Sequence, residues 1–318
     1  MTRAAYRAHL PQLGDTRLLT DGGIETTLIF HEGLDLPLFA AFTLLKQSEG
    51  RAALRRYYAR HAEVARAQGV GFVLDSATWR ASRDWGDQLG YDAAALEEAN
   101  LDAVALLFEL RGAFEADQPF VISGNIGPRG DGYAPGALMT PEEAADYHDA
   151  QVASLEAAGV DMISAITMTH TGEAAGIAMA AKRHGVPLAL SFTLETDGRL
   201  PSGQALGEAI REVDADPSGG PAYYMINCAH PDHFRGTLEP SADWVGRIRG
   251  LRANASRLSH TELDAAETLD EGNPTELARD YAGLLGLMPN LRVFGGCCGT
   301  DHRHVHAIGE ACIPACAA

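Results

Sequence analysis

The stretch from Thr140 to Ala165, TPEEAADYHDAQVASLEAAGVDMISA, carries the pattern that decides the fold. Thr140 can cap a helix whose first turn holds a proline and two glutamates. An alanine-rich amphipathic run then continues to Gly159, a residue that commonly ends helices. The apolar run Asp161–Ala165 follows at once and is typical of a buried strand. A helix that leads directly into a buried strand is the building unit of parallel α/β proteins.

The same alternation of strand and helix recurs along the whole chain. The predicted strands are the short apolar runs Arg17–Thr20, Gly71–Leu74, Phe120–Ser123, Asp161–Ala165, Pro187–Ser191, Ala222–Ile226, Arg247–Arg252 and Leu291–Phe294. The predicted helices are Glu49–Gln68, Ala93–Ala116, Pro141–Ala158, Gly172–His184, Gln204–Val213, a short turn at Trp244, Pro274–Gly286 and Asp301–Cys312. Eight such units predict an α/β protein with a (β/α)8 TIM barrel, formed as one domain over residues 1–318.

An open, doubly wound sheet is the alternative fold. Asp21-Gly22-Gly23-Ile24-Glu25 follows the first predicted strand but lacks the G-x-G-x-x-G spacing usual in that fold, so the barrel is favoured. In a barrel, the loops after the strands form the carboxyl face, where active sites lie. The longest of these loops, Ser256–Gly272, is polar and is expected to be either a lid or a disordered flap.

Composition and charge narrow the class of protein. Hydrophobic residues make up 46% of the 318 residues and charged residues 21%, as in ordinary globular proteins. The net charge of −18 disfavours nucleic acid as a partner. We see no signal peptide in Met1–Asp15 and no apolar run long enough to span a membrane. Five cysteines, an odd number, favour a cytoplasmic protein whose cysteines do chemistry or bind metal.

Three cysteines follow two strands that only one other strand separates. Cys228 comes after the sixth predicted strand, and Cys297 and Cys298 come after the eighth. Adjacent residues of a regular strand face opposite ways, so both sulfurs can turn inward only if flanking glycines permit an irregular backbone. Three thiolates match tetrahedral zinc with one open position. The alternatives are buried small hydrophobic residues or a disulfide between Cys297 and Cys298.

These motifs together resemble the zinc-dependent homocysteine S-methyltransferase family. The resemblance rests on Asn227-Cys228, Gly295-Gly296-Cys297-Cys298-Gly299, Asp21-Gly22-Gly23-Ile24-Glu25-Thr26, Gly124-Asn125-Ile126-Gly127-Pro128 and Trp79-Arg80-Ala81-Ser82. It implies a (β/α)8 barrel, Zn²⁺ on Cys228, Cys297 and Cys298, and methyl transfer to a thiol. The partners it implies are small molecules, a thiol acceptor and an onium methyl donor such as S-methylmethionine, betaine or a dimethylsulfonio compound. S-adenosylmethionine as donor and a homo-oligomer are left open.

One position departs from the family pattern. Members that bind homocysteine usually carry a glutamate–threonine pair at the end of the fourth strand, where the acid holds the amino group. This chain has Ile166-Thr167 instead, and isoleucine cannot neutralise an ammonium. Thr167 or His170 could offer neutral hydrogen bonds, or the acceptor is another thiol. Arg80 stands where relatives tend to carry a neutral residue, and it could pair with a carboxylate of either substrate.

Other candidate substrate contacts lie after the first three strands. Gly22 and Gly23 are expected to offer backbone N–H groups to a substrate carboxylate while Asp21 orients the site; alternatively, Asp21 and Glu25 cap the next element. Asn125 belongs to the segment shared with the family.

Aromatic residues and an asparagine complete the candidate site. Trp79, Trp85 and Tyr133 could form an aromatic wall for a cationic methyl group, although each could equally serve packing. Asn227 precedes a proposed ligand and is expected to orient it by a hydrogen bond.

Two other functions remain open from the sequence. One is a non-catalytic relative that buffers zinc or senses thiols through the three cysteines. The other is a metal-free enzyme in which Cys228 attacks and His230 acts as base. Cys312 and Cys316, close to Pro314, are expected to be free thiols with no assigned role.

Overall fold

In the computed structural model, which describes residues 4–115, 117–217, 219–266 and 268–313, eight parallel strands close into a barrel in chain order. The strands are β1 (Leu18–Thr20), β2 (Gly71–Asp75), β3 (Phe120–Ile126), β4 (Met162–Met168), β5 (Leu188–Thr193), β6 (Tyr223–Asn227), β7 (Ile248–Ala253) and β8 (Val293–Gly296). Leu18 pairs with Gly71 of β2 on one side and with Val293 of β8 on the other, which closes the ring. The predicted TIM barrel and each of its eight strands are confirmed.

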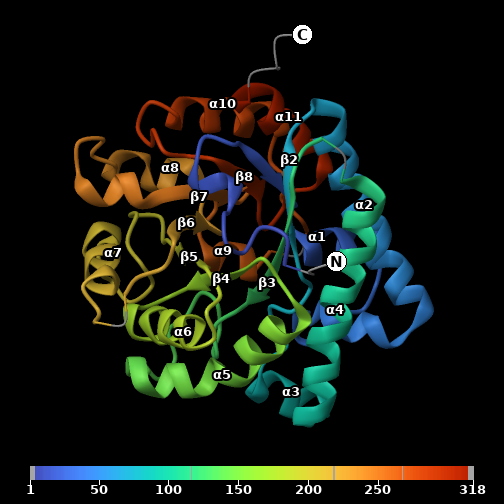
Figure 1. Ribbon diagram of the computed structural model, residues 1–318. Coiled ribbons are helices and arrows are strands. Elements are labelled where there is room, and N and C mark those ends of the chain that lie inside the picture. The colour runs from blue at the N-terminus through green and yellow to red at the C-terminus, as the bar shows by residue number, and fades with distance from the viewer. Residues whose placement is uncertain (1–3, 116, 218, 267, 314–318) are drawn as a thin grey trace.

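A ring of helices surrounds the strands (Figure 1). The longer ones are α2 (Ser48–Gln68), α4 (Ala93–Phe114), α5 (Pro141–Ala158), α6 (Thr171–Arg183), α7 (Leu206–Asp214), α10 (Pro274–Leu284) and α11 (His302–Cys312). Shorter ones lie in the loops: α1 (Ile24–Thr26), α3 (Arg83–Leu89), α8 (Pro231–Phe234) and α9 (His260–Asp264). The turn predicted at Trp244 is a 3₁₀ turn, Asp243–Arg247.

The helix boundaries follow the predicted signals. Thr140 accepts a hydrogen bond from the N–H of Glu143, and the Glu143 side chain accepts one from the N–H of Thr140, so α5 begins with a full capping box. Gly159 ends α5 in the left-handed conformation with φ 90°, and Gly69 ends α2 with φ 66°. Local sequence therefore sets where these helices begin and end.

Two layers of apolar side chains make the core. Inside the barrel, alternate strand residues such as Leu18, Val121, Met162 and Tyr223 fill the interior. Their neighbours along the strands pack outward against the helices, so every strand is buried on both faces.

In the described part of the chain, no helix combines the length and hydrophobicity that a membrane span requires.

Loops cover the carboxyl end of the barrel. The segment after β7 contains α9, and its described residues hold contacts to the site: His260 stacks on Tyr133, with ring centroids 4.1 Å apart. Ser256 also donates to Asp270 across the segment. Of the two expectations for residues 256–272, a cover over the site fits the structure and a disordered flap does not; residue 267 lies outside the described residues.

Candidate active site

A cavity of about 390 Å³ opens at the carboxyl ends of the strands, and the candidate residues gather in it. Most of the site residues predicted from the sequence line this cavity: Asp21, Gly22, Gly23, Glu25, Trp79, Arg80, Asn125, Tyr133, Thr167, Cys228, Cys297 and Cys298. Asn227, Trp85 and His170 are not among its lining residues. Other residues of its lining are the apolar Ile166 and the polar or aromatic Tyr58, Arg252 and His260. The barrel topology thus brings together side chains from positions 21 to 298.

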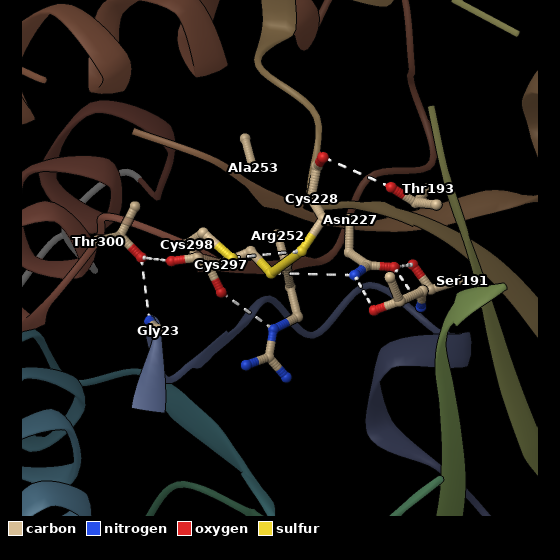
Figure 2. Close-up of a disulfide and its surroundings, with 12 residues drawn as sticks. Gly23, Ser191, Thr193, Asn227, Cys228, Arg252, Ala253, Cys297, Cys298 and Thr300 are labelled. Atoms are coloured by element: carbon tan, nitrogen blue, oxygen red, sulfur yellow. Dashed lines mark hydrogen bonds between the residues drawn. A yellow bond between two sulfur atoms is a disulfide. The ribbon is translucent and has the colours of Figure 1, made fainter. Parts of the chain in front are cut away.

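The three cysteines converge at the end of the barrel (Figure 2). Cys228 and Cys297 form a disulfide, with their Cα atoms 5.5 Å apart, and the Cys298 Sγ lies 3.8 Å from the Cys228 Sγ. Zinc ligation by these three cysteines stays a prediction, and the alternative of a Cys297–Cys298 disulfide is wrong, since Cys228 is the residue joined to Cys297. The reason is the convergence itself, because sulfurs near enough to share one ion are also near enough to be oxidised together. All three sulfurs lie within 4.8 Å of one another, so this cluster could hold a metal ion.

Backbone conformation and close packing bring the cysteines inward. Cys228 leaves β6 with φ 52°, a left-handed conformation that is uncommon for a non-glycine residue. After β8, Thr300 N–H donates to the Cys297 carbonyl at 3.1 Å, which makes a tight turn with Gly299 at φ 78°. Gly296 has no positive φ; a Cβ there would lie 2.0 Å from the Thr300 Oγ1. Of the flanking glycines, Gly299 supplies the irregular backbone and Gly296 supplies room.

The expected role of Gly22 and Gly23 needs correction. The Gly22 N–H donates to the His61 Nε2 at 3.2 Å, and the Gly23 N–H donates to the Thr300 carbonyl at 3.0 Å. Neither N–H is therefore free for a substrate carboxylate. A Cβ on Gly23 would lie 2.7 Å from the Cys297 carbonyl oxygen, so this glycine lets the loop after β1 approach the cysteine turn.

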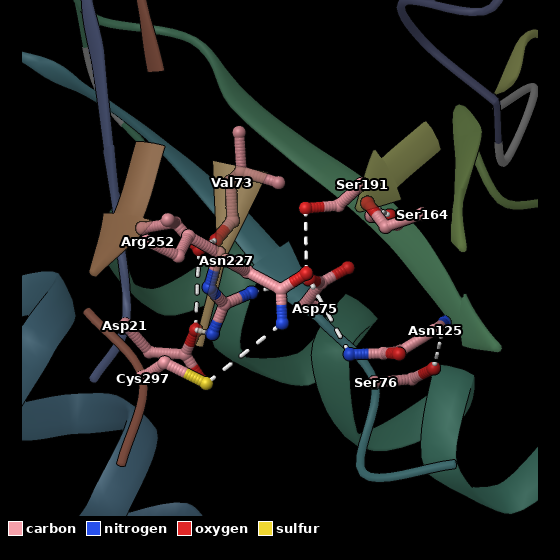
Figure 3. A network of polar contacts seen from close by, with 12 residues as sticks. Asp21, Val73, Asp75, Ser76, Asn125, Ser164, Ser191, Asn227, Arg252 and Cys297 are labelled. Carbon is pink, nitrogen blue, oxygen red and sulfur yellow. Dashed lines mark hydrogen bonds and ion pairs between the residues drawn. The ribbon is translucent and has the colours of Figure 1, made fainter. Parts of the chain in front are cut away.

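Asn227 connects the cysteine cluster to β4 and β5 (Figures 2 and 3). Its Oδ1 accepts from the Thr167 N–H at 2.9 Å and from the Ser191 hydroxyl at 2.6 Å. Its Nδ2 donates to the Thr167 Oγ1 at 2.9 Å and lies 3.9 Å from the Cys297 Sγ. The sulfur that Asn227 contacts belongs to Cys297, although the prediction concerned its neighbour Cys228. Thr167, at φ 66°, is thereby fixed by both of its polar groups.

Tyr133 and His260 complete the sulfur site; Tyr133 was predicted only as part of an aromatic wall, and no motif pointed to His260. The Tyr133 hydroxyl lies 3.2 Å from the Cys298 Sγ and 3.8 Å from the Cys228 Sγ. His260, stacked on Tyr133, places its Nε2 at 2.6 Å from the Cys228 carbonyl. Burial raises the pKa of the Cys298 thiol, so in the absence of a cation this sulfur stays protonated at neutral pH.

Below the sulfurs, Arg252 is enclosed by two carboxylates (Figure 3). Its Nη2 donates to the Asp21 Oδ1 at 2.5 Å, its Nη1 to the Asp75 Oδ2 at 2.6 Å and its Nε to the Gly296 carbonyl at 3.2 Å. Burial alone would lower the pKa of Arg252, but the two carboxylates outweigh burial and raise it. Asp21 also accepts a hydrogen bond from the Tyr57 hydroxyl at 2.9 Å. This network fixes the end of β1 against β2 and β7.

The family model for homocysteine S-methyltransferase matches residues 18–312. The chain belongs to the homocysteine S-methyltransferase family. Its members are enzymes, and they include homocysteine S-methyltransferase 4 of Zea mays, which is 23% identical over 96% of this chain and 92% of its own length. The prediction of one domain over residues 1–318 stays a prediction.

Solved structures show the same fold. The oxidized form of the Escherichia coli homocysteine methyltransferase MmuM superposes with a TM-score of 0.73 at 20% identity, covering 95% of this chain and 98% of that chain. The metallated form of MmuM superposes with a TM-score of 0.69 at 20% identity, covering 93% and 96%.

Within this family fold, Arg80 and the tryptophans are arranged differently from the expectation. The Arg80 guanidinium lies over the Trp79 ring at 3.9 Å and over the Trp85 ring at 3.6 Å. The Arg80 side chain therefore covers one face of each indole ring. Trp85 does not line the cavity. Tyr133 in turn stacks on His260. Trp85 was expected to contact a cationic methyl group as part of an aromatic wall. This prediction is wrong, because the cation that contacts the Trp85 ring is the Arg80 guanidinium.

The metal-free nucleophile hypothesis lacks its base. The His230 Nδ1 accepts from the Asp232 N–H at 3.2 Å, and its Nε2 lies 3.8 Å from the Asp280 carboxylate. Both ring nitrogens thus face acids and backbone outside the cavity, and burial lowers the pKa of His230 to about 4. Elsewhere, Cys312 is buried in α11, which raises the pKa of its thiol to about 12 and makes it unreactive. Cys316 lies outside the described residues.

Proposed function

We propose that this chain is a zinc-dependent S-methyltransferase that moves a methyl group from a small onium donor to a thiol. The observation that carries the proposal is the convergence of Cys228, Cys297 and Cys298 within 4.8 Å in a cavity of about 390 Å³. Family membership supports the reaction class. The printed names of the relatives make homocysteine the first acceptor to test, and Ile166 keeps another small thiol as the alternative.

The cysteines fit zinc once the disulfide is reduced. Tetrahedral zinc with bonds of about 2.3 Å places its sulfur ligands roughly 3.8 Å apart, and the Cys228 and Cys298 sulfurs are 3.8 Å apart. Metal binding requires thiolates, so Cys228 and Cys297 must first be reduced. The existence of an oxidized and a metallated form of MmuM supports the idea that such a site can be found in both states.

When bound by Cys228, Cys297 and Cys298, zinc would lower the pKa of the acceptor thiol and so supply a thiolate at neutral pH. In the transfer step, the acceptor sulfur forms a bond to the methyl carbon. The bond from that carbon to the positive sulfur or nitrogen of the donor breaks, and its electron pair leaves with a neutral sulfide or amine. The acceptor thiol proton goes to solvent. This chain holds the two substrates in line and excludes bulk water, which lowers the entropic part of the barrier.

Side chains around the sulfurs position the site. Asn227 fixes Cys297 and Thr167 relative to each other, and Tyr133 and His260 cover Cys298 and Cys228 from the loop side. Arg252 holds Asp21 and Asp75 in place beneath them. None of these groups is needed as a general base, because a thiolate attacks a methyl group without further proton transfer.

The test begins with metal content per chain, measured by elemental analysis on protein purified under reducing conditions without chelator or metal-affinity resin. We expect about one zinc per chain, lost in Cys298→Ser together with turnover, while the circular dichroism spectrum is unchanged. A screen of sulfonium and quaternary ammonium donors against small thiols follows. A Cys298→Ser variant that keeps both zinc and activity would contradict the assignment. Absence of zinc after reconstitution under reductant would do the same.

A further inference from the structure

The backbone of Cys228 is held by hydrogen bonds at both of its polar groups. Cys228 leaves β6 with φ 52°, in the left-handed region that residues with a side chain rarely adopt. Its N–H donates to the Arg252 carbonyl on β7 at 3.1 Å. Its carbonyl accepts from the His260 Nε2 at 2.6 Å and lies 3.5 Å from the Thr193 hydroxyl, a contact that Figure 2 shows. This conformation turns the Cys228 sulfur toward the other two cysteines, so the groups that hold it also hold the cluster together.

His260 makes the shorter of the two contacts to that carbonyl, and its own position is well defined. It is the first residue of α9, and Ser259 before it caps this helix in a capping box with Glu262. The imidazole is stacked on the Tyr133 ring with 29° between the two planes, and His260 is only 6% exposed. A buried ring that is fixed at its backbone and along one face has little freedom to leave the Cys228 carbonyl.

Glu195 contacts the other nitrogen of the same ring. It lies in the loop after β5, and its Oε1 is 3.2 Å from the His260 Nδ1. A turn fixes the backbone of Glu195, whose N–H donates to the Arg199 carbonyl at 2.8 Å and whose carbonyl accepts from the Gly198 N–H at 2.9 Å. The ring of His260 therefore lies between two acceptors, a carboxylate at Nδ1 and the Cys228 carbonyl at Nε2, and together they set its orientation.

Three loops thus meet beside the cysteines. Tyr133 comes from the loop after β3, Glu195 from the loop after β5 and His260 from the loop after β7. His260 contacts both of the other loops as well as Cys228. Because its Nε2 donates to a backbone carbonyl, the imidazole is not a base for a bound thiol. Its contacts instead fix the backbone of a cysteine.

We propose that His260, held by Glu195 and Tyr133, is a positioning residue of the sulfur site. Its hydrogen bond to the Cys228 carbonyl maintains the left-handed backbone that brings the Cys228 sulfur to the other two. This inference rests on the proposed function for the zinc that the sulfurs hold, and it adds the loop after β7 to the site. The cluster is fully assembled only when that loop covers the cavity, so covering the cavity and binding the metal favour each other.

The first measurement needs no metal. In the full-length chain, the Cys228–Cys297 disulfide is equilibrated with reduced and oxidised glutathione, and the oxidised fraction is determined by alkylation and mass spectrometry. His260→Ala should shift this equilibrium toward the reduced form by about 5-fold, the value of one hydrogen bond, because the fold then holds the two sulfurs together less well. The second measurement is the zinc affinity of the reduced chain, by competition with a chromophoric chelator. We expect His260→Ala to weaken zinc binding by a similar factor.

Conservative variants distinguish positioning from general packing. In His260→Gln the side-chain amide can donate to the same carbonyl, because its nitrogen reaches about as far as the histidine Nε2, so both measurements should stay near the wild-type values. His260→Asn carries the same amide on a shorter side chain and should behave like His260→Ala. If His260→Ala fails to fold, the Gln and Asn variants decide the question, and equal losses in both would contradict positioning. Thr261→Ala, an exposed neighbour on α9, is the control and should change neither value.

A double-mutant cycle tests whether Glu195 acts through the imidazole. Glu195→Ala should weaken zinc binding in the wild-type background and have no further effect in His260→Ala. Glu195→Gln keeps a polar group that can contact the Nδ1 and should retain most of the affinity. Glu208→Ala removes an exposed carboxylate on α7 and should leave the affinity unchanged. An added loss from Glu195→Ala on top of His260→Ala would overturn the role given to Glu195.

The outcomes separate this inference from the proposed function. A chain that binds no zinc, but whose disulfide equilibrium responds to His260→Ala and is restored in His260→Gln, would support the positioning role and count against the methyltransferase proposal. Zinc binding and methyl transfer with an unchanged zinc affinity in His260→Ala would overturn the positioning role alone. A disulfide equilibrium that is the same in the wild type and His260→Ala would also overturn it.

Discussion

Arg252 and Arg80 line the same cavity, yet their charges are satisfied in different ways. Arg252, at the end of β7, donates to two carboxylates and a carbonyl, so the protein itself uses its hydrogen-bonding capacity (Figure 3). Arg80 has one carbonyl partner and two indole faces, and its buried Nε has no hydrogen-bond partner among the described residues. The difference shows two ways of holding a buried cation: Arg252 is neutralised by carboxylates that join three strands, whereas Arg80 is held by one carbonyl and two aromatic rings.

Of the variants considered, Arg252→Met should cause the largest loss in the free energy of unfolding. It leaves Asp21 and Asp75 buried without their cation, and such losses typically cost 3–5 kcal/mol, so we expect about that decrease in the free energy of unfolding. Arg80→Met removes one hydrogen bond and its indole contacts and should cost only about 1–2 kcal/mol. Urea denaturation of both variants measures the difference. Equal losses would show that Arg80 is as structural as Arg252.

Asn227→Ala tests whether zinc binding by the cysteines depends on the side chain that contacts Cys297. We expect zinc affinity and turnover to fall together by about 10- to 100-fold, because such supporting contacts fix the orientation of ligands. Competition with a chromophoric chelator measures the affinity. Asn290→Ala, which removes a side chain that donates to the Gly246 carbonyl, is the matched control and should leave both values unchanged. Wild-type zinc affinity in Asn227→Ala would show that the contact at 3.9 Å to Cys297 has no effect.

Ile166→Glu tests whether the cavity recognises the amino group of the acceptor thiol. Ile166 lines the cavity on β4, at the position where the resemblance to the family predicts an acid for the homocysteine amino group. Restoring that acid should raise kcat/KM for homocysteine about 10-fold relative to 4-mercaptobutanoate, the value of one charged contact. Steady-state kinetics with both thiols measure the ratio. An unchanged ratio would indicate that the cavity accepts a thiol without an amino group.

Thr140→Ala should have the smallest effect and concerns the outer shell of the barrel alone. It removes the capping box of α5, so we expect a loss of about 1 kcal/mol in the free energy of unfolding. Metal content and kcat should stay at wild-type values, because Thr140 is exposed and contributes nothing to the cavity. Thermal unfolding and elemental analysis check the two parts separately. A loss of zinc in this variant would mean that the site and the outer helices are not independent.

Much of the fold could be predicted because its determinants are local. The cap at Thr140, the stop at Gly159 and the apolar run that begins β4 are neighbours in the chain, and the periodicity of each element needs no tertiary information. The cysteine cluster was also predictable, since parallel strands place their carboxyl ends on one face and the cysteines follow β6 and β8. The order of elements alone brings those sulfurs together.

The tertiary structure decided how the charges and the backbone around the cluster are used. Asp21 and Arg252 are 231 positions apart, so nothing local reveals that they pair. The N–H groups of Gly22 and Gly23 were predicted to bind a ligand, but in the folded chain they donate to His61 and Thr300. The sequence determines which residues reach the carboxyl end of the barrel, because the order of strands and helices along the chain can be read from local patterns. Which of them remain free for a ligand depends on contacts between distant segments, and these exist only in the folded chain.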